Sequence, residues 1–383
     1  MSGTVKIGVV GCGNISTAYL ENARMFAGFR ITACADLNES ATRRTADRFG
    51  LRPLGVPELL AHPSIDVVLN LTVPAAHFEI SSGALGQGKH VFTEKPLTSA
   101  LEDGRKLVSL AKDRDLSIGC APDTFLGAAG RRARAIIDAG DIGTPILGTA
   151  VMMSSGPDVW HPDPAFYFQE GAGPVLDMAP YYLTMLVQLL GPVAEVGAMS
   201  RIGATERTIR GAGRKRGQTF PVQTPTSSAA LLRFRDGAIV NMVMSFDVSR
   251  HSAAPIEIHG TRGSLSLPDP DTFGGPVRLA RAGEGWSEIA TDQDIFGRLN
   301  YPSPLDPDGP IDRANYRGVG LADFADAIGS GRSPRASGNL ALHVLEVMQR
   351  IVAPIGTDRF NRIDSTVEPP EPLSEDEARS YVT

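Results

Sequence analysis

Short apolar runs alternate with helix-like segments over the first third of the chain. Each run is apolar on both faces, as in a strand buried in a parallel sheet, and the segments between them repeat apolar positions at helical spacing. The pattern predicts strands at 5–10, 30–35, 66–72, 90–93 and 117–120, and helices at 15–26, 39–49, 77–86 and 99–114. Because strands alternate with helices of this length, we predict an α/β domain with a doubly wound parallel sheet.

The pattern changes after a helix predicted at 126–139. Strand-like runs follow at 146–153, 227–234, 238–246, 254–259 and 264–267, mostly without helices between them. Asp236-Gly237 between two of these runs predicts a hairpin. One helix is expected at 180–190, and later helices at 321–328, at 339–352 and at the polar C-terminus. This part therefore predicts an α+β domain with a large, mostly antiparallel sheet.

These patterns predict two domains, with limits at 1–123 and 124–383. A chain of 383 residues exceeds one typical hydrophobic core, which agrees with this division. We expect the late helices to pack back on the first domain.

A glycine turn joins the first predicted strand to the first helix. Gly11 permits a tight turn, and Gly13 lets the backbone approach a pyrophosphate, while Asn14 and Ile15 open the helix. The free N–H groups and the positive end of that helix favour an anion. The sequence therefore favours a dinucleotide site here; the alternative is a turn that merely connects the two elements.

An acidic residue, Asp36, follows the second strand about twenty residues after the glycine turn. A carboxylate there can accept hydrogen bonds from the adenine ribose hydroxyls and would repel a 2′-phosphate, which favours NAD over NADP. Arg43 and Arg44 could reach back, so NADP stays possible. Asp36 could also, or only, cap the helix at 39–49, and the two roles are compatible.

Several polar residues fall at the carboxyl ends of predicted strands, where parallel sheets bind ligands. These residues are Asp36, Thr72, Glu94, Lys95 and Asp123. Their shared position predicts a site at this edge of the sheet.

Composition and charge exclude several other classes of protein. With 42% hydrophobic and 21% charged residues and a net charge of -6, the chain is typical of a globular protein and does not suggest a nucleic-acid partner. We interpret the Arg-rich stretch 201–216 as a solvated loop. Three cysteines without C-x-x-C spacing argue against disulfides and zinc. With neither a signal segment nor a membrane-length apolar run, the sequence predicts a cytoplasmic protein with no membrane partner.

The chain resembles the glucose–fructose oxidoreductase / inositol dehydrogenase (Gfo/Idh/MocA) family. The similarity lies in G-C-G-N-I-S near the start, in Thr93-Glu94-Lys95-Pro96, and in the later G-A-G-P-V-L-D-M-A-P-Y-Y. It implies a Rossmann domain followed by an open sheet often used for oligomerisation, and hence a homo-oligomer, a dimer or a tetramer.

The resemblance also implies roles for individual residues. Glu94 would lie near the nicotinamide ribose, Lys95 at the reaction centre, and a cis bond before Pro96. Thr72, Pro74 and His77 resemble the family's nicotinamide-side loop.

One position departs from the family pattern. Asp177-Met178-Ala179-Pro180 is followed by Tyr181 where the family has histidine. If the helix continues across Pro180, Asp177 and Tyr181 share one face and Tyr182 points roughly 100° away. Either Tyr181 replaces the histidine as base, or Lys95 is the base and Tyr181 and Asp177 orient the substrate; we favour Lys95. The alternatives are an aromatic packed at the domain seam for Tyr181 and a helix cap near Pro180 for Asp177.

A few further residues are weaker candidates for substrate binding. His161 and Tyr167 belong to a loop that could cover a sugar, although proline-rich loops are often only rigid connectors. Asp123, Tyr182 and Arg317 complete this set. His161 and Asp163 are too few to propose a metal site.

Together these features predict an NAD(P)-dependent oxidoreductase acting on a secondary alcohol of a carbohydrate, glycoside or polyol. Two alternatives stay open: a glycosidase or isomerase that retains its cofactor and oxidises transiently, and a non-catalytic NAD-binding regulator.

Overall fold

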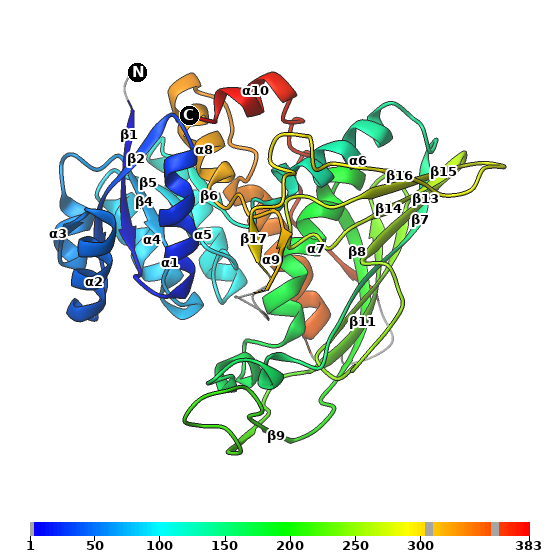
Figure 1. Ribbon diagram of the computed structural model, residues 1–383, viewed down its shortest axis with the longest axis horizontal. Helices are drawn as coiled ribbons and strands as arrows, with labels where there is room; N and C mark the ends of the chain where they lie inside the picture. Colours follow the sequence, from blue (N-terminus) through cyan, green and yellow to red (C-terminus); the bar gives the residue numbers. More distant parts are fainter. Residues whose placement is uncertain (1–3, 303–308, 354–359) are drawn as a thin grey trace. The chain divides into compact units, whose positions relative to one another are not determined.

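The computed structural model describes residues 4–302, 309–353 and 360–383 (Figure 1). Contacts between Cα atoms divide the chain into two compact units. Unit 1 comprises Met1–Leu126, Tyr316–Leu345 and Pro370–Thr383, and unit 2 comprises Gly127–Asn315 and Glu346–Pro369. The predicted domain limit at residue 123 stays a prediction.

Unit 1 is built on a six-stranded sheet in which all neighbouring strands are parallel. The strands are β1 (Val5–Val10), β2 (Phe29–Ala35), β3 (Arg52–Pro53), β4 (Val67–Asn70), β5 (His90–Thr93) and β6 (Ile118–Cys120). Their order, β3-β2-β1-β4-β5-β6, is that of a dinucleotide-binding sheet. The predicted doubly wound sheet is thus confirmed, and β3 is an additional strand too short to predict.

Helices cover both faces of this sheet (Figure 1). They are α1 (Asn14–Asn22), α2 (Glu39–Phe49), α3 (Val56–Ala61), α4 (His77–Gly86), α5 (Leu101–Asp113) and α8 (Val319–Ser330). The last helix of the unit is α10 (Glu375–Ser380). The predicted helix 15–26 is shorter than expected, because α1 ends at Asn22 and a 3₁₀ turn, η1 (Ala23–Met25), follows. Helix α9 (Gly338–Val352) begins in unit 1.

A buried ionic cluster fixes the C-terminal segment within unit 1. The Asp323 carboxylate is fully buried and accepts hydrogen bonds from Arg335 Nη1 (2.6 Å) and from Arg332 (2.8 Å). Arg335 also donates to Glu377 of α10 (2.8 Å). Through Arg335, this cluster connects Asp323 of α8 to Glu377 of the last helix, so we expect removal of the Arg335 guanidinium to be costly.

Unit 2 is built on a nine-stranded sheet in the order β16-β15-β14-β13-β7-β12-β11-β8-β19. Its strands are β7 (Pro145–Met153), β8 (Val193–Arg201), β11 (Ser227–Phe234), β12 (Ile239–Ser245), β13 (Ile256–Gly260), β14 (Gly263–Leu267), β15 (Val277–Arg281), β16 (Ser287–Ile289) and β19 (Asn361–Arg362). All neighbouring pairs are antiparallel except β7 and β12. The hairpin at Asp236-Gly237 joins β11 to β12, as predicted, with Gly237 at φ 94°.

Shorter elements complete unit 2. Two small sheets pair β9 (Glu206–Thr208) with β10 (Thr219–Pro221) and β17 (Tyr301–Pro302) with β18 (Ile311–Arg313). Helix α6 (Ala128–Asp138) packs against α7 (Pro174–Leu190), and α7 packs against β7, β11 and β12. Among the residues described, no helix is both long and apolar enough to cross a bilayer.

Helix α7 starts six residues earlier than predicted. A proline inside a helix lacks one hydrogen-bond donor, so the sequence favoured a start at Pro180. The helix instead begins after Gly173, which adopts φ 93°, with Pro174 in its first turn, and it continues across Pro180. All its residues beyond Pro180 are buried, and this packing offsets the lost hydrogen bond.

The interpretation of 201–216 as a solvated loop is wrong for Arg207. Its side chain is 11% exposed and pairs with Asp158 (2.7 Å) and with Asp247. The guanidinium lies over the Phe168 ring, 5.0 Å from its centroid. The buried carboxylate of Asp158, the more exposed carboxylate of Asp247 and an aromatic face explain this arginine. No local pattern reveals these partners because they are distant in sequence.

Candidate active site

The glycine turn leaves open space in front of helix α1. Gly11 adopts φ 104°, and a Cβ there would lie 2.5 Å from the Leu71 carbonyl oxygen. Gly13 is the N-cap of α1 without a capping side chain, and a Cβ there would meet nothing within 4 Å. Asn14 and Ile15 form the first turn. The exposed N–H end of the helix and the open space at Gly13 fit a pyrophosphate.

Asp36 lies directly beside this turn. One carboxylate oxygen accepts the Cys12 N–H (2.8 Å), and the other accepts the Asn38 N–H (2.8 Å). The side chain of Asn38, not of Asp36, caps α2 by accepting from Ser40 and Ala41. The alternative role of Asp36 as a helix cap is therefore wrong. Its fixed carboxylate suits the adenine ribose hydroxyls.

The loop after β4 is held by His77, whose side chain is fully buried. One ring nitrogen lies 2.6 Å from the Pro96 carbonyl oxygen and the other 3.0 Å from that of Thr72. Burial lowers the pKa of His77, although two carbonyl neighbours favour the charged ring. His77 thus connects the loops after β4 and β5 and supports the position of Thr72. Pro74 opens the 3₁₀ turn η2 (Pro74–Ala76) that leads into α4.

Glu94 follows β5 and is nearly buried, at 8% exposed. One of its oxygens accepts the Tyr19 hydroxyl (3.0 Å), and the other accepts the Lys95 N–H (2.8 Å). The Lys95–Pro96 bond is cis, as the resemblance implied. Burial and the nearby Glu94 charge raise the pKa of Tyr19, so its hydroxyl stays protonated and donates.

Sequence reasoning missed Tyr19. Its only local signal is an aromatic residue on the buried face of α1, which is equally typical of core packing. The partner, Glu94, is 75 residues away, so no spacing rule connects the two.

Asp123 lies at the carboxyl end of β6 and is 1% exposed. Its Oδ2 accepts the backbone N–H groups of Gly318 and Gly320 (both 2.9 Å). Burial raises the pKa of Asp123, and these two donors and the Arg317 charge oppose that rise. The structure thus places the predicted residues Asp123 and Arg317 close together, where Asp123 positions the start of α8.

In unit 2, Asp177 and Tyr181 share one face of α7 because the helix continues across Pro180. Asp177 lies in the first turn, so the alternative of a cap near Pro180 is wrong. Tyr181 is 8% exposed and Tyr182 2%. Burial and the charges of Asp269 and Asp271 raise the pKa of Tyr182.

His161 and Tyr167 come together in the loop between β7 and α7, with ring centroids 5.6 Å apart. Trp160 and Phe166 belong to the same cluster. The structure therefore brings the two predicted loop residues together, and it adds Phe166, which the sequence analysis did not include.

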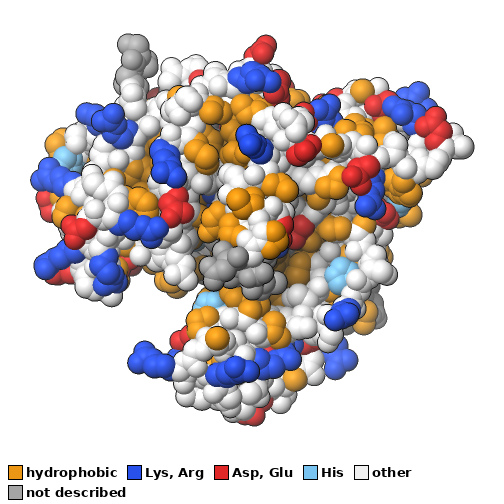
Figure 2. All heavy atoms as spheres, in the orientation of Figure 1, with side chains coloured by type: hydrophobic (Ala, Val, Ile, Leu, Met, Phe, Trp, Pro, Cys, Tyr) orange, Lys and Arg blue, Asp and Glu red, His pale blue; other side chains and the backbone are white. Residues whose placement is uncertain are grey.

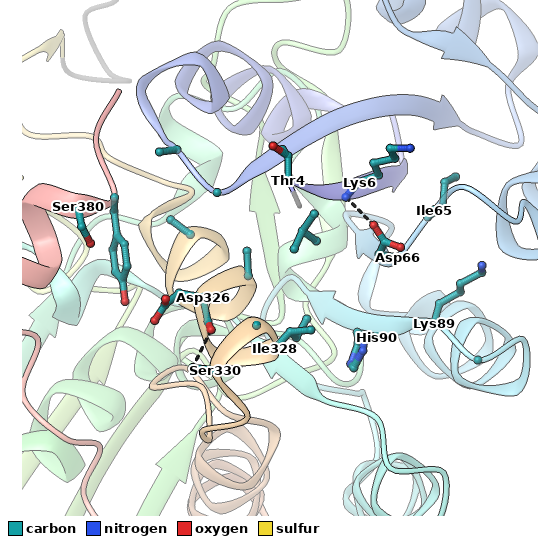
Figure 3. Close-up of a pocket in the computed structure, with 18 of the residues that line it drawn as sticks. Thr4, Lys6, Ile65, Asp66, Lys89, His90, Asp326, Ile328, Ser330 and Ser380 are labelled. Carbon is teal, nitrogen blue, oxygen red and sulfur yellow. Dashed lines mark hydrogen bonds between the residues drawn. The ribbon is translucent and has the colours of Figure 1, made fainter. Parts of the chain in front are cut away.

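A separate cavity of about 820 Å³ lies at the opposite, amino ends of β1 and β5 (Figure 3). Thr4, Lys6 and His90 line it on the strand side and Asp326 on the α8 side. Because parallel sheets bind ligands at the carboxyl ends of their strands, this cavity is not the predicted cofactor site.

Two family models match the chain. Residues 5–120 match "Oxidoreductase family, NAD-binding Rossmann fold", and residues 131–266 match "GFO/IDH/MocA C-terminal domain". The chain belongs to the Gfo/Idh/MocA family. This confirms the predicted resemblance and the prediction of an oxidoreductase with an NAD-binding first domain. It also agrees with the predicted fold, in which a parallel sheet is followed by a mostly antiparallel one.

Relatives in this family are similar over most of their length. The 1,5-anhydro-D-fructose reductase of Ensifer adhaerens is 26% identical over 372 residues, covering 94% of this chain and 98% of that protein. The myo-inositol 2-dehydrogenase of Thermotoga maritima is 26% identical, covering 68% and 74%. The solved structure of levoglucosan dehydrogenase with NADH and levoglucosan has a TM-score of 0.78 at 23% identity, covering 94% and 100% of the chains, which shows a shared fold.

Proposed function

We propose that this protein is an NAD(P)-dependent dehydrogenase that oxidises a secondary alcohol of a sugar, glycoside or polyol. The observation that carries the proposal is the Glu94-Lys95-Pro96 segment at the carboxyl end of β5, with Glu94 fixed by Tyr19. Relatives named for anhydrofructose, inositol and levoglucosan support the substrate class.

The residues that would hold the cofactor are Gly11, Gly13 and the first turn of α1 for the pyrophosphate, and Asp36 for the adenine ribose. When bound, the nicotinamide supplies the redox chemistry, since it accepts or returns a hydride. Asp36 would repel a 2′-phosphate, so we propose NAD as the preferred cofactor and NADP as the lesser one.

The chain itself handles the proton and the alignment of the substrate. Lys95 Nζ takes the proton from the reacting hydroxyl, and Tyr181 and Asp177 orient the substrate. Glu94 accepts the Lys95 backbone N–H, which fixes the direction in which this residue leaves β5. Fixed geometry of this kind contributes to rate because little reorganisation accompanies proton transfer.

A panel of sugars, inositols and glycosides, screened for reduction of NAD and of NADP, tests the proposal. Accumulation of NADH with at least one secondary alcohol is the expected result. Cleavage or isomerisation of a glycoside without net NADH would instead identify a retained cofactor with transient oxidation. A stoichiometric cofactor complex inert to every compound would identify a regulator.

We also propose a cytoplasmic homo-oligomer, a dimer or a tetramer. One face of the nine-stranded sheet exposes Leu147, Leu231, Ile239 and Met199, with exposed fractions of 40–83%. Leu147 and Ile239 are cross-strand partners, so these side chains are adjacent on the sheet. Exposed apolar area of this kind is typical of an interface. Light scattering of wild type and Leu231→Asp tests this, with a smaller particle expected for the variant.

A further inference from the structure

Four rings form an exposed cluster on the loop between β7 and α7 of unit 2: Trp160, His161, Phe166 and Tyr167. Trp160 is 43% exposed and Phe166 51%. The ring centroids of Trp160 and Tyr167 are 6.4 Å apart, and those of Phe166 and Tyr167 are 4.1 Å apart with an interplanar angle of 32°. Figure 2 shows hydrophobic side chains and a histidine gathered near the loops that precede α7, beside Lys and Arg side chains.

The backbone under these rings is rigid. Asp158, 2% exposed, accepts hydrogen bonds from Arg207 (2.7 Å) and Arg210 (3.1 Å). The Asp158 carbonyl oxygen also accepts the N–H groups of Arg210 (2.8 Å) and Gly211 (3.1 Å). A Cβ at Gly211 would lie 2.4 Å from the His161 carbonyl oxygen, so two backbone segments meet there. The backbone that carries the rings is therefore anchored to the segment around residues 207–211, while the rings of Trp160 and Phe166 stay exposed.

His161 adds a fixed donor to this cluster. Its Nδ1 accepts the Asp163 N–H (3.0 Å), which places the proton of the neutral ring on Nε2. Burial lowers the pKa of His161, so the neutral form dominates at pH 7. A rigid apolar platform with a neutral donor beside it suits a neutral ligand that has both C–H faces and hydroxyls, as a pyranose has.

The platform is connected directly to the helix that carries the proposed substrate residues. The Tyr167 carbonyl oxygen accepts the N–H of Gly173 (3.0 Å), the N-cap of α7. At about 1.5 Å per residue, Asp177 lies about 6 Å and Tyr181 about 12 Å farther along the helix axis. These are rises of the backbone along the axis, and Tyr167 is bonded at the N-terminal end of the helix, so a ligand that contacts both Tyr181 and the platform must extend along α7.

We propose that the platform of Trp160, His161, Phe166 and Tyr167 binds a second ring of the substrate, which is therefore a glycoside of at least two rings. The inference rests on the proposed function for the identity of the reacting ring. It narrows the substrate class, since it disfavours free inositols and free monosaccharides.

The two tryptophans of the chain allow a direct binding test that needs neither NAD nor turnover. Trp286 is 50% exposed in the segment before β16. With excitation selective for tryptophan, Trp286→Phe reports on Trp160 alone, and Trp160→Phe, which keeps only Trp286, is the matched control. Titration with maltose, cellobiose or lactose is expected to change the fluorescence of Trp286→Phe saturably and to leave Trp160→Phe unchanged. Glucose and myo-inositol are expected to produce at most a weak change.

A kinetic comparison complements the titration. Trp160→Ala is expected to lower kcat/KM for the best disaccharide by roughly tenfold or more, and to change that for a methyl glycoside by less than about twofold. Circular dichroism checks that the variant is folded, and Trp286→Ala is the control.

The outcomes separate the two proposals. Saturable disaccharide binding at Trp160 without NADH formation from any sugar would support the platform and overturn the dehydrogenase. If NADH forms with equal kcat/KM for one-ring and two-ring substrates, and Trp160→Ala leaves both kcat/KM values unchanged, the platform proposal is overturned and the dehydrogenase proposal stands. Trp160 fluorescence that changes with protein concentration but not with added sugar would also overturn the platform proposal, because it would indicate a contact between copies of the chain.

Discussion

Replacing Tyr19 by phenylalanine removes one hydroxyl group and keeps the aromatic ring in the core. That hydroxyl donates to Glu94 Oε1 over 3.0 Å, and Tyr19 is 2% exposed and Glu94 8%, so water replaces the donor poorly. A hydrogen bond to a charged acceptor is worth about 1.5–3 kcal/mol. For a unit of this size, a loss of about 2 kcal/mol lowers Tm by roughly 4–8 °C.

Differential scanning calorimetry of wild type and Tyr19→Phe measures this effect. The matched control is Tyr301→Phe, because Tyr301 is half-buried and its hydroxyl donates no hydrogen bond to any residue that the structure describes. We expect that control to melt within about 1 °C of wild type. Should Tyr19→Phe melt together with the control, the Tyr19–Glu94 contact would contribute nothing to the fold, and the argument for Tyr19 as a positioning residue would fail.

Four further substitutions test other parts of the account. Gly13→Ala is expected to leave Tm unchanged, because a Cβ there meets nothing within 4 Å, and to weaken NAD binding by about tenfold or more in calorimetric titration. Asp36→Ser should shift the ratio of kcat/KM from NAD towards NADP by at least about tenfold; an unchanged ratio would remove Asp36 from the ribose site. Arg335→Met removes one of the two guanidinium partners of buried Asp323 while Arg332 remains, so urea unfolding should show a loss of about 1.5–3 kcal/mol, as for a hydrogen bond to a charged group. Burial and the Asp271 charge raise the pKa of Asp269 to about 6, above its ordinary value of 3.8. The native state therefore loses stability as the pH rises from 3.8 to about 6, because the buried carboxyl must then ionise. Asp269→Asn should raise Tm at pH 7–8 and give no gain near pH 4.

Local patterns were sufficient for most of the Rossmann unit. Helices 39–49 and 77–86 and strand 90–93 have the predicted limits. For helix 39–49 the local signals agree, because Asn38 caps its start and Gly50 in the left-handed conformation ends it. β8, by contrast, was missed: only Val193 and Val196 are buried among its nine residues, and Gly197 interrupts the alternation. Its pairing with β11 is non-local, so sequence spacing carries little of the signal.

The candidate site shows the same limit. The glycine turn, Asp36 and the Glu94-Lys95-Pro96 segment could be predicted, because each is a short motif at the end of a strand. Tyr19 could not, since its role depends on a partner 75 residues away. The start of α7 was misplaced because tertiary burial outweighs the local cost of Pro180.

The most direct test of the central claim is the turnover of Lys95→Ala on the best alcohol found in the substrate panel, followed as NADH formation. The account predicts that kcat falls by roughly 10²–10⁴-fold, while the Kd of NAD, measured separately, changes by less than about threefold. Lys106→Ala, an exposed lysine on α5, is the control and should match wild type. A kcat of Lys95→Ala within about threefold of wild type would contradict the account, because the proton would then be handled by another group.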